Sequence, residues 1–251
     1  MNRATRMRYA PMISIVIPTL NEEKVIGESL RALKSRMTVP GEIIVSDGGS
    51  TDKTVEIARQ WADRVVVYSG TARQTISAGR NDGAAAATGE FLIFMDADSR
   101  IEDPDAFLLE ALRQFEAHPE VVGLTARVRV YPEQETLMDR VVFGVLSFNV
   151  RVLNNVFRRG ESVGEFQMMR KESFDKLGGF RTDLVTREDA DMFLRLSHVG
   201  RTRLDPNLLV YHSGRRAHKM GWPRLLWDWT VNTIWVALFD KAFLKEWKVI
   251  R

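Results

Sequence analysis

The sequence contains no cysteine and no long apolar run. The absence of cysteine excludes disulfides and fits a reducing compartment, so we expect a cytoplasmic protein. No window reaches the 18 apolar residues that a transmembrane helix needs, and no apolar signal-peptide core follows the basic N-terminus. With 251 residues, the chain can form one large α/β domain or one domain with an appendage.

Apolar segments of strand length alternate with helical patterns through the first 120 residues. Four such alternations predict an α/β fold with a mostly parallel, Rossmann-like sheet flanked by helices. The expected elements are a strand at 12–18, a helix from 22–23 capped by Asn21, a strand at 41–46, a helix ending at Trp61, a strand at 64–68, a helix at 72–88, a strand at 91–95 and a helix from Pro104 to about His118.

The pattern becomes less regular after residue 120. We interpret residues 12–120 as a nucleotide-binding half and residues 121–220 as a half that closes over it. No linker separates the halves, so both are assigned to one domain, 1–220. The second half is expected to contain a strand at 121–131, a helix at 137–156, a loop at 160–164, a strand at 166–169 and a helix at 187–199.

A basic, tryptophan-rich tail of amphipathic helices is predicted at 221–251. Net charge is +3, but residues 211–251 carry eight Lys or Arg and three Asp or Glu, so that segment alone is +5. Such a tail suits peripheral contact with a membrane interface, and packing on the domain or a homodimer contact is an equal alternative. No nucleic acid partner is expected. The tail holds five of the six tryptophans: Trp222, Trp227, Trp229, Trp235 and Trp247.

Two carboxylates, Asp96 and Asp98, follow the apolar strand predicted at 91–95. Side chains alternate along an extended chain, so both point to the same side. Two adjacent carboxylates repel unless a cation lies between them, and hard oxygen ligands suit Mg²⁺ or Mn²⁺. An isolated pair of this kind is more often a solvated turn, so its meaning depends on the other motifs.

Polar motifs also follow the first two predicted strands, at residues 18–22 and 46–52. The carboxyl ends of parallel strands meet at one edge of a sheet, where ligands bind in open α/β folds. Asp47 has the chemistry to accept hydrogen bonds from a base or a ribose, although a plain turn with a helix cap is the simpler interpretation. No G-x-G-x-x-G follows the first strand, which argues against a dinucleotide site.

Taken together, the motifs resemble those of family 2 glycosyltransferases with the GT-A fold. The segments that match in order are Ile15–Glu22, Val45–Asp52, Ala78–Asn81 and Phe94–Asp98, within a resemblance that covers about residues 12–212. The family is inverting and metal-dependent and uses nucleotide-sugar donors. The resemblance implies nucleotide contacts from Pro18, Thr19, Asn21, Glu22 and Asp47, with Arg80 near the diphosphate, Asp96 at the ribose or metal and Asp98 on the metal.

A further segment, Thr186–Leu196, resembles the family's Glu-Asp motif at a helix N-terminus. By this resemblance Asp189 is the base that takes the proton of the acceptor hydroxyl, and Glu188 orients it or contacts the acceptor. Phe193 and Leu196 share a helical face with Asp189 and are expected to anchor it. The alternative is that these acids only favour the helix dipole.

His212, Arg215 and Arg216 follow the last predicted strand. An imidazole is a reasonable third metal ligand beside carboxylates, and a structural histidine is the alternative. The two arginines are expected to contact phosphate oxygens of the donor diphosphate or of a phosphorylated acceptor.

The predicted function is a metal-dependent transfer of one sugar from a UDP- or GDP-sugar, with Mn²⁺ or Mg²⁺. A glycan or a polyprenyl lipid is the expected acceptor, since relatives resembling dolichyl-phosphate mannose synthases have interfacial helices after the catalytic domain. The Gln-x-x-Arg-Trp motif of processive synthases is missing after the Glu-Asp segment. Two other functions stay open. A sugar-nucleotide pyrophosphorylase would need a Gly-rich loop after the first strand, and a non-catalytic sugar- or lipid-binding scaffold would not need these acids.

Overall fold

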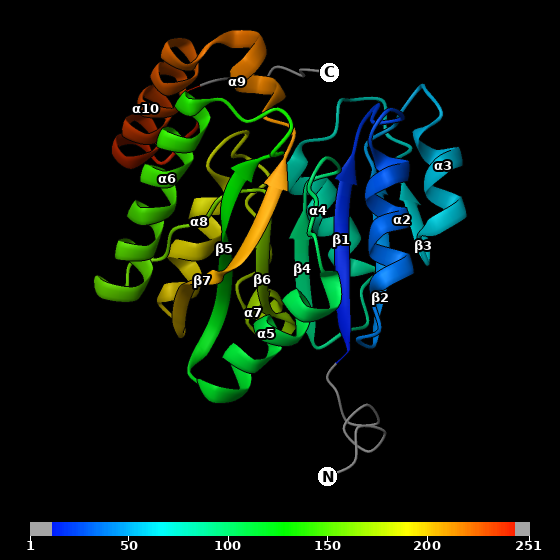
Figure 1. The fold of residues 1–251 in the computed structure, drawn as a ribbon, viewed down its shortest axis with the longest axis horizontal. Helices are drawn as coiled ribbons and strands as arrows, with labels where there is room; N and C mark the ends of the chain where they lie inside the picture. The colour runs from blue at the N-terminus through cyan, green and yellow to red at the C-terminus, as the bar shows by residue number, and fades with distance from the viewer. Residues whose placement is uncertain (1–11, 244–251) are drawn as a thin grey trace.

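A computed structural model describes residues 12–243, and its centre is a seven-stranded sheet in the order β3-β2-β1-β4-β6-β5-β7. Figure 1 shows the sheet from one side with its flanking helices. The strands are β1 (Ile13–Thr19), β2 (Gly41–Asp47), β3 (Arg64–Val67), β4 (Phe91–Met95), β5 (Val121–Val130), β6 (Phe166–Arg170) and β7 (Arg201–His212).

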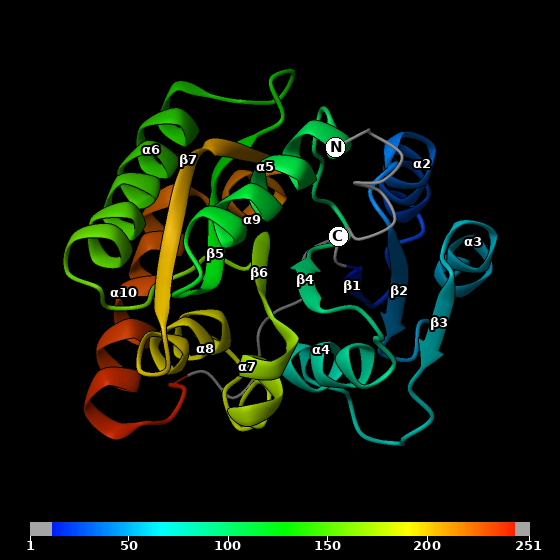
Figure 2. The same cartoon turned by 90° about the horizontal axis from the view of Figure 1, so that it is seen from below.

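Helices cover both faces of this sheet, as the view from below shows (Figure 2). They are α2 (Ile26–Arg36), α3 (Thr54–Trp61), α4 (Ile76–Ala85), α5 (Pro104–Ala117), α6 (Leu137–Arg151), the π-helix η1 (Val152–Val156), α7 (Lys171–Lys176), α8 (Glu188–Ser197), α9 (Arg215–Met220) and α10 (Trp222–Phe239). The α/β fold with a mostly parallel central sheet, predicted from the alternating pattern, is confirmed.

The central strands β1, β2 and β4 form because their side chains are buried on both faces. In β1 every residue but Pro18 is buried, and the β-branched Ile15 and Val16 point to opposite faces. Ile15 belongs to the core beneath α2 and α5, and Val16 to the core beneath α4 and α8. Burial on two sides fixes the parallel register in which Thr19 lies opposite Asp47. The first two polar motifs therefore leave the sheet side by side.

Strands from both halves of the chain, before and after residue 120, belong to one continuous sheet. Strand β6 lies antiparallel to both β4 and β5, and β5 is parallel to β7. Two reversals restore the original direction, so β5 and β7 end at the same edge as β1, β2 and β4. As a result His212 lies at the edge where Asp96 and Asp98 emerge.

The predicted helix cap at Asn21 is wrong, because α2 begins at Ile26, three to four residues later than expected, with Val25 at the cap position. Asn21 has a left-handed backbone with φ of 55°. Its side-chain oxygen accepts a hydrogen bond from Thr51 N at 2.8 Å, and its own N–H donates to Ser50 Oγ at 2.7 Å. The side chain therefore joins the first two motifs instead of capping a helix.

The helix expected at 137–156 consists of two parts, α6 and the π-helix η1. The side chain of Asn154 in the π-turn donates to the carbonyl oxygens of Val150 at 2.8 Å and Glu161 at 2.7 Å. These bonds fix the start of the loop that leads back into β6.

Part of the tryptophan-rich tail packs on the domain. Trp222 and Leu225 are buried against Phe143 of α6 and Val130 of β5, whereas Trp227 is 67% exposed. Trp247 lies outside the described residues. Within residues 12–243, no helix has the length and apolar character needed to cross a bilayer.

The buried carboxylate of Asp139 ties this tail to α6. It caps α6 by accepting hydrogen bonds from Thr136 N and Oγ1, both at 2.8 Å. It also accepts from Trp222 Nε1 at 2.9 Å and lies 2.8 Å from His218 Nε2. The helix cap and the first turn of α10 thus share one acceptor.

We predict that Asp139→Asn lowers the free energy of unfolding by about 1–3 kcal/mol, because it leaves buried donors without a full set of acceptors. Urea unfolding followed by tryptophan fluorescence measures this change. The control is Asp175→Asn, which removes an exposed pair with Lys171 and is expected to cost less than about 0.5 kcal/mol. Equal losses in the two variants would contradict the assigned role of Asp139.

Candidate active site

The predicted site residues meet at the carboxyl edge of the sheet. Thr19 ends β1, Asp47 ends β2 and His212 ends β7, and Asp96 directly follows β4. Glu188 begins α8, which packs on one face of the same sheet. Segments from five parts of the chain therefore supply polar groups to one place.

Asp47 shapes the loop after β2. Its carboxylate is fully buried and accepts hydrogen bonds from Thr19 Oγ1 at 3.1 Å, Gly49 N at 3.0 Å and Ser50 N at 2.8 Å. Gly49 has φ of 91°, a backbone conformation that residues with a Cβ atom rarely adopt. These contacts hold both carboxylate oxygens of Asp47 within the protein. Its contact with a nucleotide stays a prediction.

Arg215 connects the first motif to the carboxylate pair. Its two terminal nitrogens donate to the carboxylate of Glu22 at 2.7 and 2.8 Å, a bidentate pair. Its Nε lies 3.3 Å from Asp98 Oδ2, which also accepts a hydrogen bond from Ser213 Oγ. Arg215, predicted to contact phosphate, thus contacts two acids here, and Arg216 follows it, half-buried, in α9.

Arg80 makes the corresponding connection on the other side of the carboxylate pair. Only 1% of this residue is exposed. Its Nη1 donates to Glu188 Oε1 at 2.8 Å, and its Nη2 lies 3.4 Å from Asp96 Oδ1 and 3.3 Å from the carbonyl oxygen of Gly164. The guanidinium therefore bridges the second half of the chain to Asp96.

Three carboxyl groups around Arg80 have raised pKa values. Burial raises the pKa of Asp96 to about 7, although about a third of its side chain (34%) is still exposed. Burial, with a smaller contribution from the charge of Asp189, also raises the pKa values of Glu188 and Glu165 to about 7. Carboxylates crowded in this way favour the binding of a cation.

His212 is a half-buried imidazole that is neutral at pH 7. Burial lowers its pKa to about 4. Its ring packs edge-on against Phe143 with centroids 4.8 Å apart, and Nδ1 lies 3.9 Å from Glu165 Oε1. Nε2 is buried and has no hydrogen-bond partner. A neutral ring with an unpaired nitrogen has the chemistry of a metal ligand.

The three proposed ligands do not form a closed metal site. No cluster of three or more His, Asp or Glu side chains between residues 12 and 243 is arranged to hold a metal ion. Asp98 Oδ2 is occupied by Ser213 and Arg215, as described above. The donor types, two hard carboxylates and an imidazole with a free nitrogen, nevertheless fit Mn²⁺ or Mg²⁺.

Asp189 lies in the first turn of α8 and is half-buried. Its Oδ1 accepts a hydrogen bond from Ala190 N at 2.8 Å, and Gln167 Nε2 donates to its carbonyl oxygen at 3.1 Å. Phe193 and Leu196 are fully buried beneath it, as their helical spacing predicts. This packing fixes the turn that carries Asp189.

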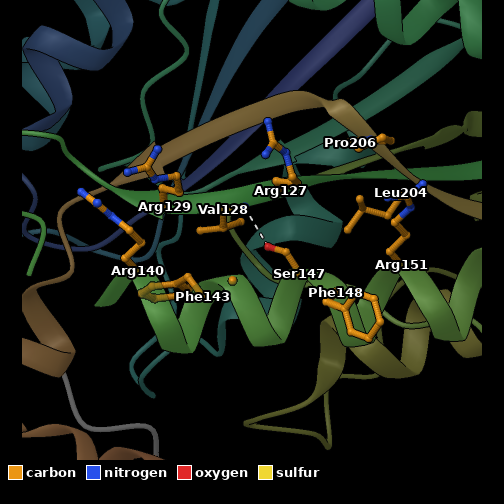
Figure 3. A pocket seen from close by; sticks show the side chains of 11 residues that line it. Arg127, Val128, Arg129, Arg140, Phe143, Ser147, Phe148, Arg151, Leu204 and Pro206 are labelled. Atoms are coloured by element: carbon orange, nitrogen blue, oxygen red, sulfur yellow. Dashed lines mark hydrogen bonds between the residues drawn. The ribbon is translucent and has the colours of Figure 1, made fainter. Parts of the chain in front are cut away.

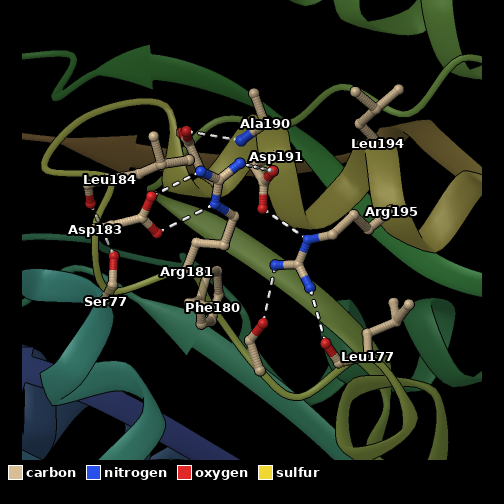
Figure 4. Close-up of polar contacts among 12 residues, drawn as sticks. Ser77, Leu177, Phe180, Arg181, Asp183, Leu184, Ala190, Asp191, Leu194 and Arg195 are labelled. Carbon is tan, nitrogen blue, oxygen red and sulfur yellow. Dashed lines mark hydrogen bonds and ion pairs between the residues drawn. The ribbon is translucent and has the colours of Figure 1, made fainter. Parts of the chain in front are cut away.

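Asp191, the third acid of the same turn, has a structural role (Figure 4). It accepts a hydrogen bond from Arg195 Nε at 2.7 Å, and Arg195 also donates to the carbonyl oxygens of Leu177 at 3.1 Å and Gly179 at 2.8 Å. The pair attaches α8 to the glycine-containing turn before it.

Sequence reasoning missed three residues of the site: Gly164, Glu165 and Ser213. A Cβ atom on Gly164 would lie 3.2 Å from Arg80 Nη2, 3.7 Å from Asp189 Oδ2 and 3.9 Å from Asp96 Oδ2, so this glycine lies between the two acids. Its place depends on the antiparallel entry of β6, which no local pattern reveals. Ser213 could have been found from its position next to His212 at a strand end.

Comparison with known proteins agrees with this geometry. The sequence model of the family described as Glycosyl transferase family 2 matches residues 14–178. EpsE of Bacillus subtilis, which bears the name of a glycosyltransferase, is 28% identical over 205 residues, or 77% of this chain and 69% of EpsE. A PGL/p-HBAD biosynthesis glycosyltransferase of Mycobacterium bovis is 36% identical over 100 residues, and this match spans 38% of this chain and 39% of that protein.

Solved structures share the fold. The mannosyltransferase PcManGT from Pyrobaculum calidifontis, in complex with GDP-Man and Mn²⁺, has a TM-score of 0.72 at 22% identity, covering 93% of this chain and 66% of PcManGT. TarS (residues 1–349) of S. aureus, in complex with UDP-GlcNAc, has a TM-score of 0.64 at 20% identity, covering 94% of this chain and 68% of TarS. The GT-A fold expected from the motifs is confirmed by this likeness. On the family match, which extends over well more than half of its length, the chain belongs to glycosyl transferase family 2 and is a glycosyltransferase.

Proposed function

We propose that the protein transfers one sugar from a UDP- or GDP-sugar to an acceptor, with inversion at the anomeric carbon and with Mn²⁺ or Mg²⁺. The observation that carries the proposal is the pair of arginine bridges, Glu22–Arg215–Asp98 and Asp96–Arg80–Glu188. They gather the nucleotide motif, the carboxylate pair and the Glu-Asp motif at one edge. Fold neighbours solved with GDP-Man and with UDP-GlcNAc support the donor class.

Residues 12–120 would hold the nucleotide and residues 121–220 the acceptor, within one catalytic domain, 1–220. The nucleotide contacts would come from the ends of the first two strands. Arg215 and Arg216 would contact the diphosphate once the acids beside Arg215 are shared with a cation. The proposed nucleotide residues are Pro18, Thr19, Asn21, Glu22, Asp47 and Asp96.

Asp98, Asp96 and His212 would hold the divalent cation, which supplies positive charge to the leaving diphosphate when it is bound. Neutral His212 offers the buried Nε2 described above. Asp98 would exchange its contact with Arg215 for the cation. The guanidinium freed from Asp98 stays within reach of the same edge, where it can bind phosphate oxygens.

Asp189 would act as the base. In one in-line displacement the acceptor oxygen forms a bond to the anomeric carbon, the bond from that carbon to the diphosphate oxygen breaks, and the acceptor proton passes to Asp189. Glu188, held by Arg80, would orient this turn. A lipid-phosphate acceptor is already ionised and would need no base. Asp189 would therefore be required for transfer to a glycan hydroxyl but not for transfer to a polyprenyl phosphate.

The other functions are less well supported. The chain has Pro-Thr-Leu-Asn-Glu at 18–22, where a pyrophosphorylase would carry a Gly-rich loop. A non-catalytic scaffold would have no need for three acids with raised pKa values around one buried arginine.

We predict that Asp98→Asn reduces sugar transfer at least about 100-fold, because it removes a charged ligand of the cation that stabilises the leaving group. The measurement is release of nucleoside diphosphate from a panel of UDP- and GDP-sugars with Mn²⁺. Asp82→Asn, at an exposed residue bonded to Gln74, is the control and should retain activity. Full activity of Asp98→Asn with the best donor would rule out the metal assignment.

Asp189→Asn is expected to lower kcat about 10²–10⁴-fold with a hydroxyl acceptor while the affinity for the donor stays unchanged. Steady-state kinetics and calorimetric titration of the nucleoside diphosphate separate the two effects. The matched control is Asp191→Asn in the same helical turn, which should lower Tm but keep kcat. If both variants lose kcat equally, the acids act only through the helix N-terminus.

Glu188→Gln is expected to reduce the pH dependence of stability. The folded-state pKa of Glu188 is about 7, above the ordinary value of 4.5, so the folded chain binds a proton that the unfolded chain releases. This group therefore stabilises the fold at pH 5–6, and its contribution decreases as pH rises through 7. Between pH 6 and pH 8 the loss is about 1 kcal/mol, which the variant should lack. Urea unfolding at both pH values tests this, and an unchanged difference would contradict the assigned pKa.

A further inference from the structure

Helix α6 has an exposed apolar stripe on the side that faces away from the core. Leu137, Val141, Val145 and Phe148 follow one another at helical spacing and are 76%, 52%, 64% and 68% exposed. The same helix buries Phe143 and Val150 on its inner side. A surface helix with apolar side chains on both sides indicates a second contact surface.

The apolar surface extends beyond α6. Val156 of the π-helix and Phe157 after it are each 68% exposed. Helix α10 lies beside α6 in both views (Figures 1 and 2) and has exposed apolar side chains of its own. Those of α10 are Leu226, Trp227, Ile234, Trp235, Leu238 and Phe239.

The exposed charged side chains of α6 and of the segment that follows it, up to residue 160, are all basic. Residues 140–160 contain four arginines, Arg140, Arg151, Arg158 and Arg159, and no acidic residue. The one acid of α6, Asp139, is completely buried and bonded to His218 and Trp222. A partner for this surface therefore has to offer both apolar groups and negatively charged groups.

A cavity of about 330 Å³ lies between α6 and strands β5 and β7, beside the exposed stripe (Figure 3). Its wall contains apolar side chains, among them Val128, Phe143, Phe148 and Leu204. Four arginines also line it: Arg127 and Arg129 from β5, and Arg140 and Arg151 from α6.

Two of these four arginines are paired with an acid of the chain and two are not. Arg129 and Arg140 share the carboxylate of Glu135. Arg127 and Arg151 make no ion pair or side-chain hydrogen bond with any residue between 12 and 243. The cavity thus offers unpaired guanidinium groups next to an apolar wall, a combination that suits a phosphate attached to an apolar chain.

We propose that α6, the π-helix and this cavity form a docking surface for an anionic phospholipid bilayer. The stripe on α6 enters the interface between headgroups and acyl chains, and a lipid phosphate occupies the arginine-lined cavity. A second copy of the chain is a poor partner, since a twofold contact would place the arginines of one copy near those of the other.

The location of the surface connects it to the active site. Phe143 lines the cavity, and its ring also contacts His212 at the catalytic edge. A bilayer docked on α6 would therefore lie next to that edge, which suits an acceptor held in the membrane. Only this last step depends on the proposed transfer reaction, because lipid docking itself needs neither donor nor acceptor.

Flotation of the full chain with phosphatidylcholine vesicles, with and without phosphatidylglycerol, tests the proposal without reference to activity. We expect binding to the anionic vesicles only, weakened by salt. Arg127→Gln with Arg151→Gln should reduce the partition coefficient about thirty-fold, from about 1 kcal/mol for each arginine. Val145→Glu with Phe148→Glu should reduce it at least as much.

Leu109→Glu on α5 is the control, because Leu109 is 49% exposed but lies outside the stripe, and its binding should be unchanged. Circular dichroism verifies that all variants are folded. Equal binding to neutral vesicles, no binding to either kind, or full binding by both double variants would each overturn the proposal. So would a dimer of the parent chain that Val145→Glu with Phe148→Glu dissociates, since the surface would then serve a second copy.

Discussion

Arg80 extends from α4 beneath the end of β4 and divides its guanidinium between Asp96 and Glu188. A buried cation is tolerated only where acids and carbonyl groups surround it, and loss of one partner leaves an uncompensated charge. Because Asp96 and Glu188 belong to different halves of the chain, the charge requirement of one side chain fixes how the halves meet. The positions of Asp189 and Gly164 follow from that constraint.

Arg215 balances charge on the opposite side, where Glu22 and Asp98 would otherwise repel each other. The two arginines differ in accessibility. Arg80 has 1% of its side chain exposed and serves the architecture, whereas Arg215 has 26% of its side chain exposed and can exchange partners. One acidic edge therefore combines a fixed counter-ion with an exchangeable one.

The sequence predicted the sheet and most of the candidate site, for identifiable reasons. Apolar runs such as 91–95 are long enough to specify buried strands, and parallel strands must bring Asp47, Asp96 and Asp98 to one edge. The helix cap predicted at Asn21 does not form, because a cap and a loop contact have the same local pattern and only the neighbouring loop decides between them. The partners of Arg80 could not be predicted, since they depend on how β6 and α8 fold back onto the sheet.

The reversed direction of β6 has a consequence of another kind. Strands β1, β2, β4 and β7 contribute to the edge the residues that follow them, whereas β6 contributes the residues that precede it, Ser162 to Glu165 among them. The edge therefore consists of the segments that follow four strands and the one segment that precedes β6. Under the proposed function, changes of length or sequence in that one segment can alter acceptor selectivity without disturbing the donor loops, so the fold keeps the two substrates separately evolvable.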